Sequence, residues 1–179
     1  MEEPQPLQSQ RGATLMEVLV ALVVLSVGLL GVAGLQTTGI NASNSAFYKT
    51  QASVLAADMA ERIRANPRAD YATVEDGFDT GNSVIPSNPN CLTSNSGCTA
   101  DQMVDYDLYQ WNQLLRGDEQ SGALPVLPDA RGVISVGNNG EMIVSVLWRE
   151  RRISGSTQTA QCSVDNQPDG IVCVEMRFR

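Results

Sequence analysis

An uncharged apolar run of eighteen residues constrains this chain more than any other feature. From Val18 to Leu35 the sequence reads VLVALVVLSVGLLGVAGL, without a charge or a proline, and the next charge is Lys49. At ~1.5 Å per residue, a helix of this length covers ~27 Å, close to the ~30 Å hydrocarbon core of a bilayer. Extension through Ile40 completes a span. We therefore predict a membrane-inserted helix, with the spanning part at about residues 17–40, because the core helix of a soluble protein seldom stays uncharged for so long.

Composition excludes several classes of function. The 179 residues include 12 Lys and Arg against 20 Asp and Glu, which gives a net charge of −8. Because such a field repels phosphate, nucleic acid is not an expected partner. The chain has no histidine, and this excludes His-ligated zinc and the Ser-His and Cys-His pairs of nucleophilic catalysis. We expect a protein that is not an enzyme and that has no metal and no cofactor.

The residues before the apolar run have an unusual order. In a conventional secretory signal the small-residue cleavage site follows the apolar segment. Here Arg11, Gly12 and Ala13 precede it, and Glu17 stands at the head of the helix. A carboxylate costs ~2.5–3.5 kcal/mol near the bilayer centre and less near the interface. The N-terminal helix dipole explains why Glu17 is tolerated, but it does not explain the whole arrangement.

Gly12 followed by Ala-Thr-Leu-Met-Glu and a long apolar helix resembles the class III leader of type IV pilin-like proteins. The resemblance implies that a prepilin peptidase cuts between Gly12 and Ala13 and that Ala13 is then N-methylated. It also implies that Glu17 neutralises the N-terminal ammonium of a neighbouring subunit during fibre assembly. Such pairing is physically sound, because opposite charges in a low-dielectric helix bundle offset each other's burial cost.

Two features depart from the family pattern. The leader holds two glutamates against Arg11 alone, whereas family leaders are usually basic, so the positive-inside rule encodes the orientation weakly. Major pilins tend to carry a proline near mid-membrane, where this chain has Gly34. Together with Gly28 and Gly31, Gly34 forms either a small-residue face against neighbouring helices or a series of weak points, each costing ~1 kcal/mol relative to alanine.

The helix is predicted to continue beyond the membrane. Apolar residues recur at the 3–4 spacing of one buried face, and these are Tyr48, Ala52, Leu55, Met59 and Ile63. Asn66-Pro67 ends the pattern, because the residue before a proline is disfavoured in a helix. A helix over about residues 13–65 would be ~80 Å long. We therefore expect three parts: a leader at 1–12, an N-terminal helix at 13–66 and a globular head at 67–179.

Two further segments sharpen the resemblance. Ala56–Pro67, with the sequence AADMAERIRANP, and Val144–Arg152, with the sequence VSVLWRERR, are similar to the type IV pilus modification protein PilV group of minor pilins. This resemblance implies a low-abundance subunit that primes or caps the pilus. The implied partners are other minor pilins, the major pilin, the inner-membrane assembly platform, the prepilin peptidase and a tip adhesin.

The head is predicted to be α+β. Gly77–Ala100 is rich in Asn, Ser and Gly and is expected to be a loop, while Gln102–Gly117 has apolar residues at helical spacing. Three β-rich runs follow, the first two joined by a Gly- and Asn-rich turn: Gly132–Val136, Met142–Trp148 and Ile171–Phe178. Because no crossover helix separates the runs, the sheet is expected to be antiparallel and to pack on the long helix. The expected fold is a pilin-like lollipop.

Four cysteines suggest a head outside the cytoplasm, where thiols oxidise. Four cysteines allow three connectivities, and the sequence alone cannot choose among them. We favour Cys91–Cys98 and Cys162–Cys173, because each pair closes a short, polar, turn-rich loop. A zinc site is disfavoured, since no pair has the C-x₂-C spacing.

The remaining charged residues suggest ordinary structural roles. Three aspartates precede or open the Gln102–Gly117 helix, where carboxylates favour the helix dipole: Asp101, Asp105 and Asp107. The main basic cluster is expected to pair with acidic neighbours or with a partner subunit, and it comprises Arg149, Arg151 and Arg152.

These observations favour a minor pilin that takes part in type IV pilus assembly and hence in twitching motility. It would be held in the bacterial inner membrane by a single pass, with its head in the periplasm, and would later join the fibre at the cell surface. A type II secretion pseudopilin shares the same N-terminal features. A rival from another class is a secreted periplasmic binding protein, cleaved conventionally after Gly34 in Val32-Ala33-Gly34. A hydrolase is disfavoured because no nucleophile–base pair is visible.

Overall fold

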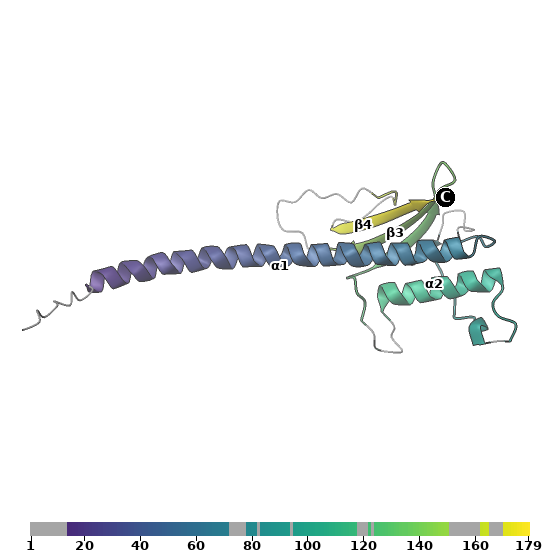
Figure 1. Ribbon diagram of the computed structural model, residues 1–179, viewed down its shortest axis with the longest axis horizontal. Helices are drawn as coiled ribbons and strands as arrows, with labels where there is room; N and C mark the ends of the chain where they lie inside the picture. Colours follow the sequence, from purple (N-terminus) through teal and green to yellow (C-terminus); the bar gives the residue numbers. More distant parts are fainter. Residues whose placement is uncertain are drawn as a thin grey trace, which may run out of the picture. The chain divides into compact units, whose positions relative to one another are not determined.

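The computed structural model describes residues 14–71, 78–81, 83–93, 95–117, 122, 124–150, 162–164 and 170–179. The chain divides into two compact units, residues 1–43 and residues 44–179, and the second is called the head unit below. In chain order the elements are α1 (Leu15–Ala65), β1 (Phe78–Asp79), the 3₁₀ turn η1 (Cys91–Thr93), α2 (Ala100–Arg116), β2 (Arg131–Val136), β3 (Met142–Arg149) and β4 (Ile171–Phe178) (Figure 1).

Helix α1 is a single helix of 51 residues, as its periodicity predicts. Thr14 precedes it and satisfies its first turn, because the hydroxyl of Thr14 accepts a hydrogen bond from the backbone N–H of Glu17 at 3.3 Å. The helix ends immediately before Asn66-Pro67, where Asn66 donates its N–H to the carbonyl of Ile63 at 3.2 Å. The predicted C-terminal boundary is therefore confirmed.

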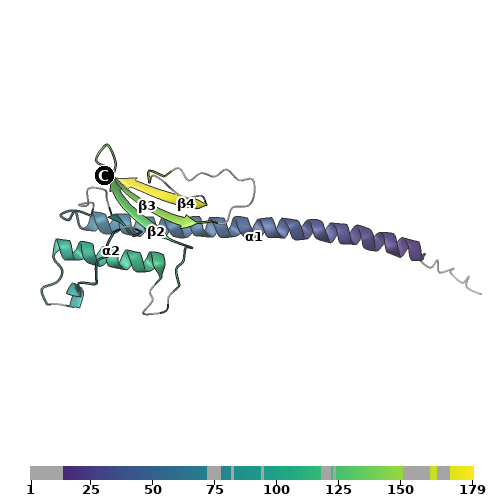
Figure 2. The same ribbon diagram turned by 180° about the vertical axis from the view of Figure 1, so that it is seen from behind.

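The four strands form one antiparallel sheet in the order β1-β2-β3-β4. Figure 2 shows β2, β3 and β4 side by side. The turn between β2 and β3 pairs Val136 with Met142, and Gly140 supplies a positive φ of 71° that L side chains rarely adopt. The antiparallel arrangement and the three main strands are confirmed, each within one residue of its expected bounds.

The expected loop at Gly77–Ala100 is partly wrong. Phe78 and Asp79 form the edge strand β1, paired with Ile134 and Val133 of β2, and η1 lies in the same stretch. A strand of two residues has no period that a sequence pattern can reveal. Its position depends on tertiary contacts, because Phe78 is buried and Asp79 pairs with Arg131 of β2.

The core of the head unit lies among α2, the C-terminal part of α1 and one face of the sheet. Figures 1 and 2 both show α2 alongside that part of α1. The indole N–H of Trp111 donates to the carbonyl of Leu55 at 3.0 Å, and the Trp111 ring lies over Gly132 of β2 so closely that a Cβ there would overlap it. Trp111 therefore joins the two helices and the sheet.

Helix α2 begins two residues before its expected start. Thr99 is the N-cap, and a complete capping box links its side chain and backbone to Gln102. The helix ends at Arg116, and Gly117 follows with a φ of 82°. The apolar stripe expected on this helix is the face that the structure buries, with Leu108, Trp111 and Leu115 in the core.

Candidate functional site

The N-terminal part of α1 is apolar on every side, and none of its most hydrophobic window is buried within the chain. By length and composition, α1 is the one helix in the described part of the chain that could cross a membrane. Its large apolar side chains from Leu15 to Leu35 are about half or more exposed. A helix that is hydrophobic all round needs lipid or other helices to cover it, so this surface is the first candidate functional site.

Three hydroxyl side chains in or just after this surface are satisfied by the helix itself. Ser26 donates to the carbonyl of Leu22 at 2.6 Å, and Thr37 and Thr38 donate to carbonyls four residues back at 3.1 and 3.2 Å. Hydroxyls bonded in this way leave no unpaired donor for lipid to desolvate. These three hydroxyls are thus compatible with a bilayer.

Three glycines interrupt the same surface, and no contact within the chain requires them. A Cβ built on Gly28, Gly31 or Gly34 would meet nothing within 4 Å. Both sequence interpretations, a packing face for other helices and a series of weak points, remain predictions.

Glu17 is the third residue of α1 and is exposed. Its backbone N–H is bound by the carbonyl of Thr14 at 3.0 Å and by the Thr14 hydroxyl. Among the residues that the structure describes, no group donates a hydrogen bond to its carboxylate or forms an ion pair with it. The charge is therefore accessible to a cation from outside the chain. The expected cleavage and methylation positions, Gly12 and Ala13, lie outside the described residues.

A second polar cluster joins α1 to α2 inside the head unit. Arg62 donates through Nε to Asp58 at 2.8 Å and through Nη1 to Asp107 at 3.1 Å and Gln110 at 2.8 Å. Asp107 also accepts a hydrogen bond from the phenol of Tyr71 at 2.6 Å. The expected dipole role of Asp107 is wrong, because this residue is the eighth of α2 and is 5% exposed. It is instead the buried partner of Arg62.

The electrostatics of this cluster keep its hydrogen-bond donors in place. Burial alone would lower the pKa of Arg62, but hydrogen bonds and charges from Asp58 and Asp107 raise it above its ordinary value. Burial and the hydrogen bond to Asp107 raise the pKa of Tyr71 well above 10.0. Arg62 is therefore charged and Tyr71 is a neutral donor throughout the physiological pH range. The spacing of Asp58 and Arg62 at i,i+4 is visible in the sequence, whereas Asp107 is not.

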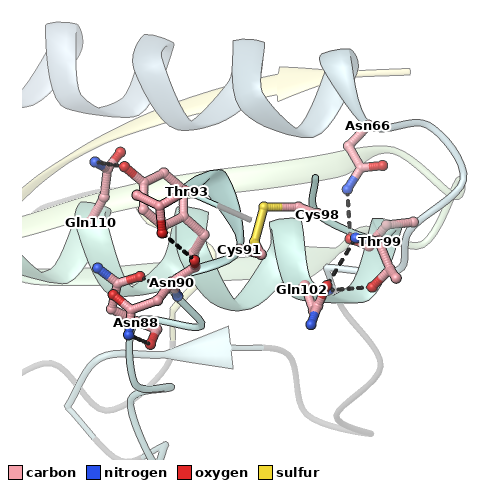
Figure 3. The surroundings of a disulfide bond; sticks show 11 residues. Asn66, Asn88, Asn90, Cys91, Thr93, Cys98, Thr99, Gln102 and Gln110 are labelled. Atoms are coloured by element: carbon pink, nitrogen blue, oxygen red, sulfur yellow. Dashed lines mark hydrogen bonds between the residues drawn. A yellow bond between two sulfur atoms is a disulfide. The ribbon is translucent and has the colours of Figure 1, made fainter. Parts of the chain in front are cut away.

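Two disulfides tie down the loops of the head unit. Cys91 is joined to Cys98 across seven positions, with the Cα atoms 4.9 Å apart (Figure 3). Cys162 is joined to Cys173, with the Cα atoms 6.4 Å apart. The first bond ends next to the N-cap of α2, where the Asn66 side chain donates to the Ala100 carbonyl at 2.9 Å. This disulfide loop therefore lies against the junction of α1 and α2.

Other charges form local pairs at the surface. Arg149 pairs with Asp129 at 2.7 Å, while Arg151 and Arg152, the rest of the expected basic cluster, lie outside the described residues. Arg177 on β4 binds Glu141 at 2.9 Å and Glu175 at 3.0 Å. Within the described ranges, no group of three or more Cys, Asp or Glu side chains is placed to hold a metal ion.

Two family models match this chain at its N-terminal side. The prokaryotic N-terminal methylation motif matches residues 7–33, and the model described as type IV pilin Tt1218 matches residues 34–109. Neither a search of curated proteins nor a search of solved structures found a match. The two matches adjoin, and they cover the apolar segment headed by Glu17 and the part of α1 that carries the Arg62 cluster. The chain therefore belongs to the type IV pilin-like proteins.

Proposed function

We propose that this type IV pilin is a minor pilin that takes part in initiating the pilus and belongs to the complex at its tip. The observation that carries the proposal is the uncharged, uncovered helical surface from Val18 to Leu35, headed by the exposed carboxylate of Glu17. Such a surface suits transfer from lipid into a bundle of like helices. The minor role is supported by the resemblance of Ala56–Pro67 and Val144–Arg152 to the PilV group.

We expect the protein to mature by removal of the leader that the sequence predicts. Prepilin peptidase removes residues 1–12 by cutting between Gly12 and Ala13, and Ala13 is then N-methylated. The product is held by a single membrane pass with residues 67–179 in the periplasm, where the pairs Cys91–Cys98 and Cys162–Cys173 oxidise. Its partners are other minor pilins, the major pilin, the inner-membrane platform and a tip adhesin.

Glu17 acts by pairing with the N-terminal ammonium of a neighbouring subunit. Burying either ion alone in a helix bundle costs several kcal/mol. Two opposite charges ~4 Å apart recover about 4 kcal/mol at an effective dielectric constant of about 20. Each charge thus offsets the burial cost of the other, and a subunit without the carboxylate would leave its neighbour's ammonium unpaired.

The test is the variant Glu17→Ala, expressed in cells from which the native gene has been deleted. We expect normal removal of the leader, judged by the mass of the membrane-bound protein, together with loss of the variant from sheared fibres. Glu61→Ala is the matched control, since Glu61 is an exposed glutamate of the same helix and should not affect incorporation. Normal incorporation of Glu17→Ala would contradict the proposed pairing.

The phenotype of the gene deletion distinguishes a role in the pilus from a role in type II secretion. A minor pilin is required for surface fibres and twitching, whereas a type II secretion pseudopilin is required for export of proteins to the medium. Loss of export with normal twitching would replace the pilus assignment by the secretion one.

A further inference from the structure

A groove of about 370 Å³ lies on the surface of the head unit. One bank is formed by side chains of α2, the other includes Leu124 and Val126, and Arg62 of α1 also lines the groove. The residues used below are Arg62, Gln110, Gln113, Leu114, Leu124 and Val126. A space of this volume could hold about a dozen waters at ~30 Å³ each.

Three apolar side chains in the walls of the groove are strongly exposed to solvent. Leu124 is 86% exposed, Leu114 is 45% and Val126 is 42%. All three line one groove, Leu114 from α2 and Leu124 and Val126 from beyond it in the sequence. A rimmed apolar surface of this kind is typical of a binding site.

The polar groups of the groove are held in place by the cluster behind them. Arg62 uses Nε and Nη1 for Asp58, Asp107 and Gln110, and within the described residues its Nη2 has no hydrogen-bond partner. Its side chain keeps 23% exposure. Because two carboxylates surround one guanidinium, the cluster is net negative and repels an anion. The free donor is therefore matched to a neutral carbonyl oxygen.

The other bank supplies an acceptor. Gln113 donates its amide N–H to the phenol of Tyr109 at 2.6 Å, and the structure gives its Oε1 no donor among the described residues. The amide of Gln110 already has a partner at each end, since its oxygen accepts from Arg62 and its nitrogen donates to Tyr106. The groove thus offers the donors of Arg62 Nη2 and the acceptor Oε1 of Gln113 between apolar walls. An acyl chain would leave both unpaired, which is costly once water is removed.

We propose that this groove docks an extended, uncharged, apolar peptide segment of a neighbouring pilin subunit. A backbone carbonyl of that segment accepts from Arg62 Nη2, a backbone N–H donates to Gln113 Oε1, and aliphatic side chains fill the space among Leu114, Leu124 and Val126. The proposal rests on the proposed function, because it requires a neighbouring subunit. It adds a head-to-head contact that is separate from the packing of the apolar helices.

The test places a photo-reactive benzoylphenylalanine at one of three positions of the full-length chain in cells. Position Leu124 probes the groove, Val27 probes the apolar helix, and Val84, which is 93% exposed and outside the groove, is the control. From Leu124 we expect a cross-link to another pilin subunit that maps to an uncharged apolar stretch. Adding Leu114→Asp should reduce its yield about tenfold, as expected for a ~1.4 kcal/mol loss, whereas adding Val84→Asp should not.

Gln113→Ala provides a second test that leaves the apolar walls intact. It should lower the Leu124 cross-link yield without changing the Val27 cross-link, since only the acceptor is removed. Unchanged tryptophan fluorescence would show that the head unit of each variant is folded.

Several results would overturn the groove proposal. The first three are a cross-link from Leu124 that stays within the same chain, a cross-link from Leu124 to lipid, and a cross-link whose yield neither groove variant changes. The fourth is the absence of any cross-link from Leu124 when Val27 does cross-link to another subunit. The last result would leave the proposed function intact. No subunit cross-link from either position would overturn both proposals.

Discussion

Replacement of Asp107 by alanine should destabilise the head unit more than any surface substitution in α2. The Asp107 side chain is 7% exposed and accepts from two groups, Arg62 at 3.1 Å and Tyr71 at 2.6 Å. In the variant, Arg62 retains its hydrogen bonds to Asp58 and Gln110. The phenol of Tyr71 keeps only a 3.5 Å contact with Asn66, so it becomes a buried donor without a good acceptor.

The magnitude follows from these contacts. Breaking a buried ion pair by removing one partner costs ~3–5 kcal/mol, and a buried donor left unpaired costs ~1–3 kcal/mol. Because Arg62 is partly exposed and retains two partners, we take the low end and expect Asp107→Ala to lower the free energy of unfolding by about 3 kcal/mol. Tyr71→Phe removes one hydrogen bond and its donor together, so it should cost about 1 kcal/mol.

Tryptophan fluorescence during urea unfolding of the full chain in detergent measures this loss selectively. The chain has two tryptophans, Trp111 and Trp148, and both are fully buried in the core of the head unit. The signal therefore reports unfolding of the head unit and not of the apolar helix. The free energy of unfolding is obtained from the urea midpoint and slope.

Asp105→Ala is the matched control, since Asp105 is exposed on the same helix two residues earlier, and it should change the free energy of unfolding by less than ~0.5 kcal/mol. A loss below about 1 kcal/mol for Asp107→Ala, or an equal loss for Asp105→Ala, would refute the interpretation of Asp107 as the buried partner of Arg62.

Two further predictions concern the sheet of the head unit. Gly132→Ala should lower the free energy of unfolding by ~1–3 kcal/mol, because the new methyl group overlaps the Trp111 ring; an unchanged urea midpoint would show that the ring can move aside. Burial alone would raise the pKa of Asp79, but the hydrogen bond from Arg131 and nearby charges lower it below its ordinary value of 3.8. The ion pair therefore stabilises the head unit above about pH 4 and is lost as the pH falls through the folded-state pKa. Asp79→Asn should flatten this acid-side loss in urea midpoints measured from about pH 6 to about pH 2, and an unchanged pH profile would contradict the assignment.

The regular elements could be predicted from the sequence because each carries its own periodic signal. The uncharged run and the 3–4 spacing that ends at Asn66 define α1, and Trp111 and Leu115 continue the stripe that defines α2. The hairpin of β2 and β3 is marked by a glycine-rich turn, and its closing glycine adopts positive φ. These signals are local, so they do not depend on knowing the tertiary structure.

The features that the sequence did not reveal depend on long-range contacts. Strand β1 has two residues and is defined by its pairing with β2. Asp107 lies 45 positions from Arg62. Its position in α2 gives no sign in the sequence that it will be buried, because its burial depends on the packing of α1 beside α2. The groove likewise combines residues from three segments of the chain, and no local sequence pattern indicates that Leu124 lines it.

The mature N-terminus is the most direct measure of whether the apolar helix is retained. Intact mass and N-terminal sequencing of the protein from membranes and from sheared fibres should give a chain that starts at N-methylated Ala13 and contains every residue to Arg179. A chain that starts at Leu35 and is recovered free in the periplasm would contradict assembly through α1, and it would favour a conventionally secreted binding protein.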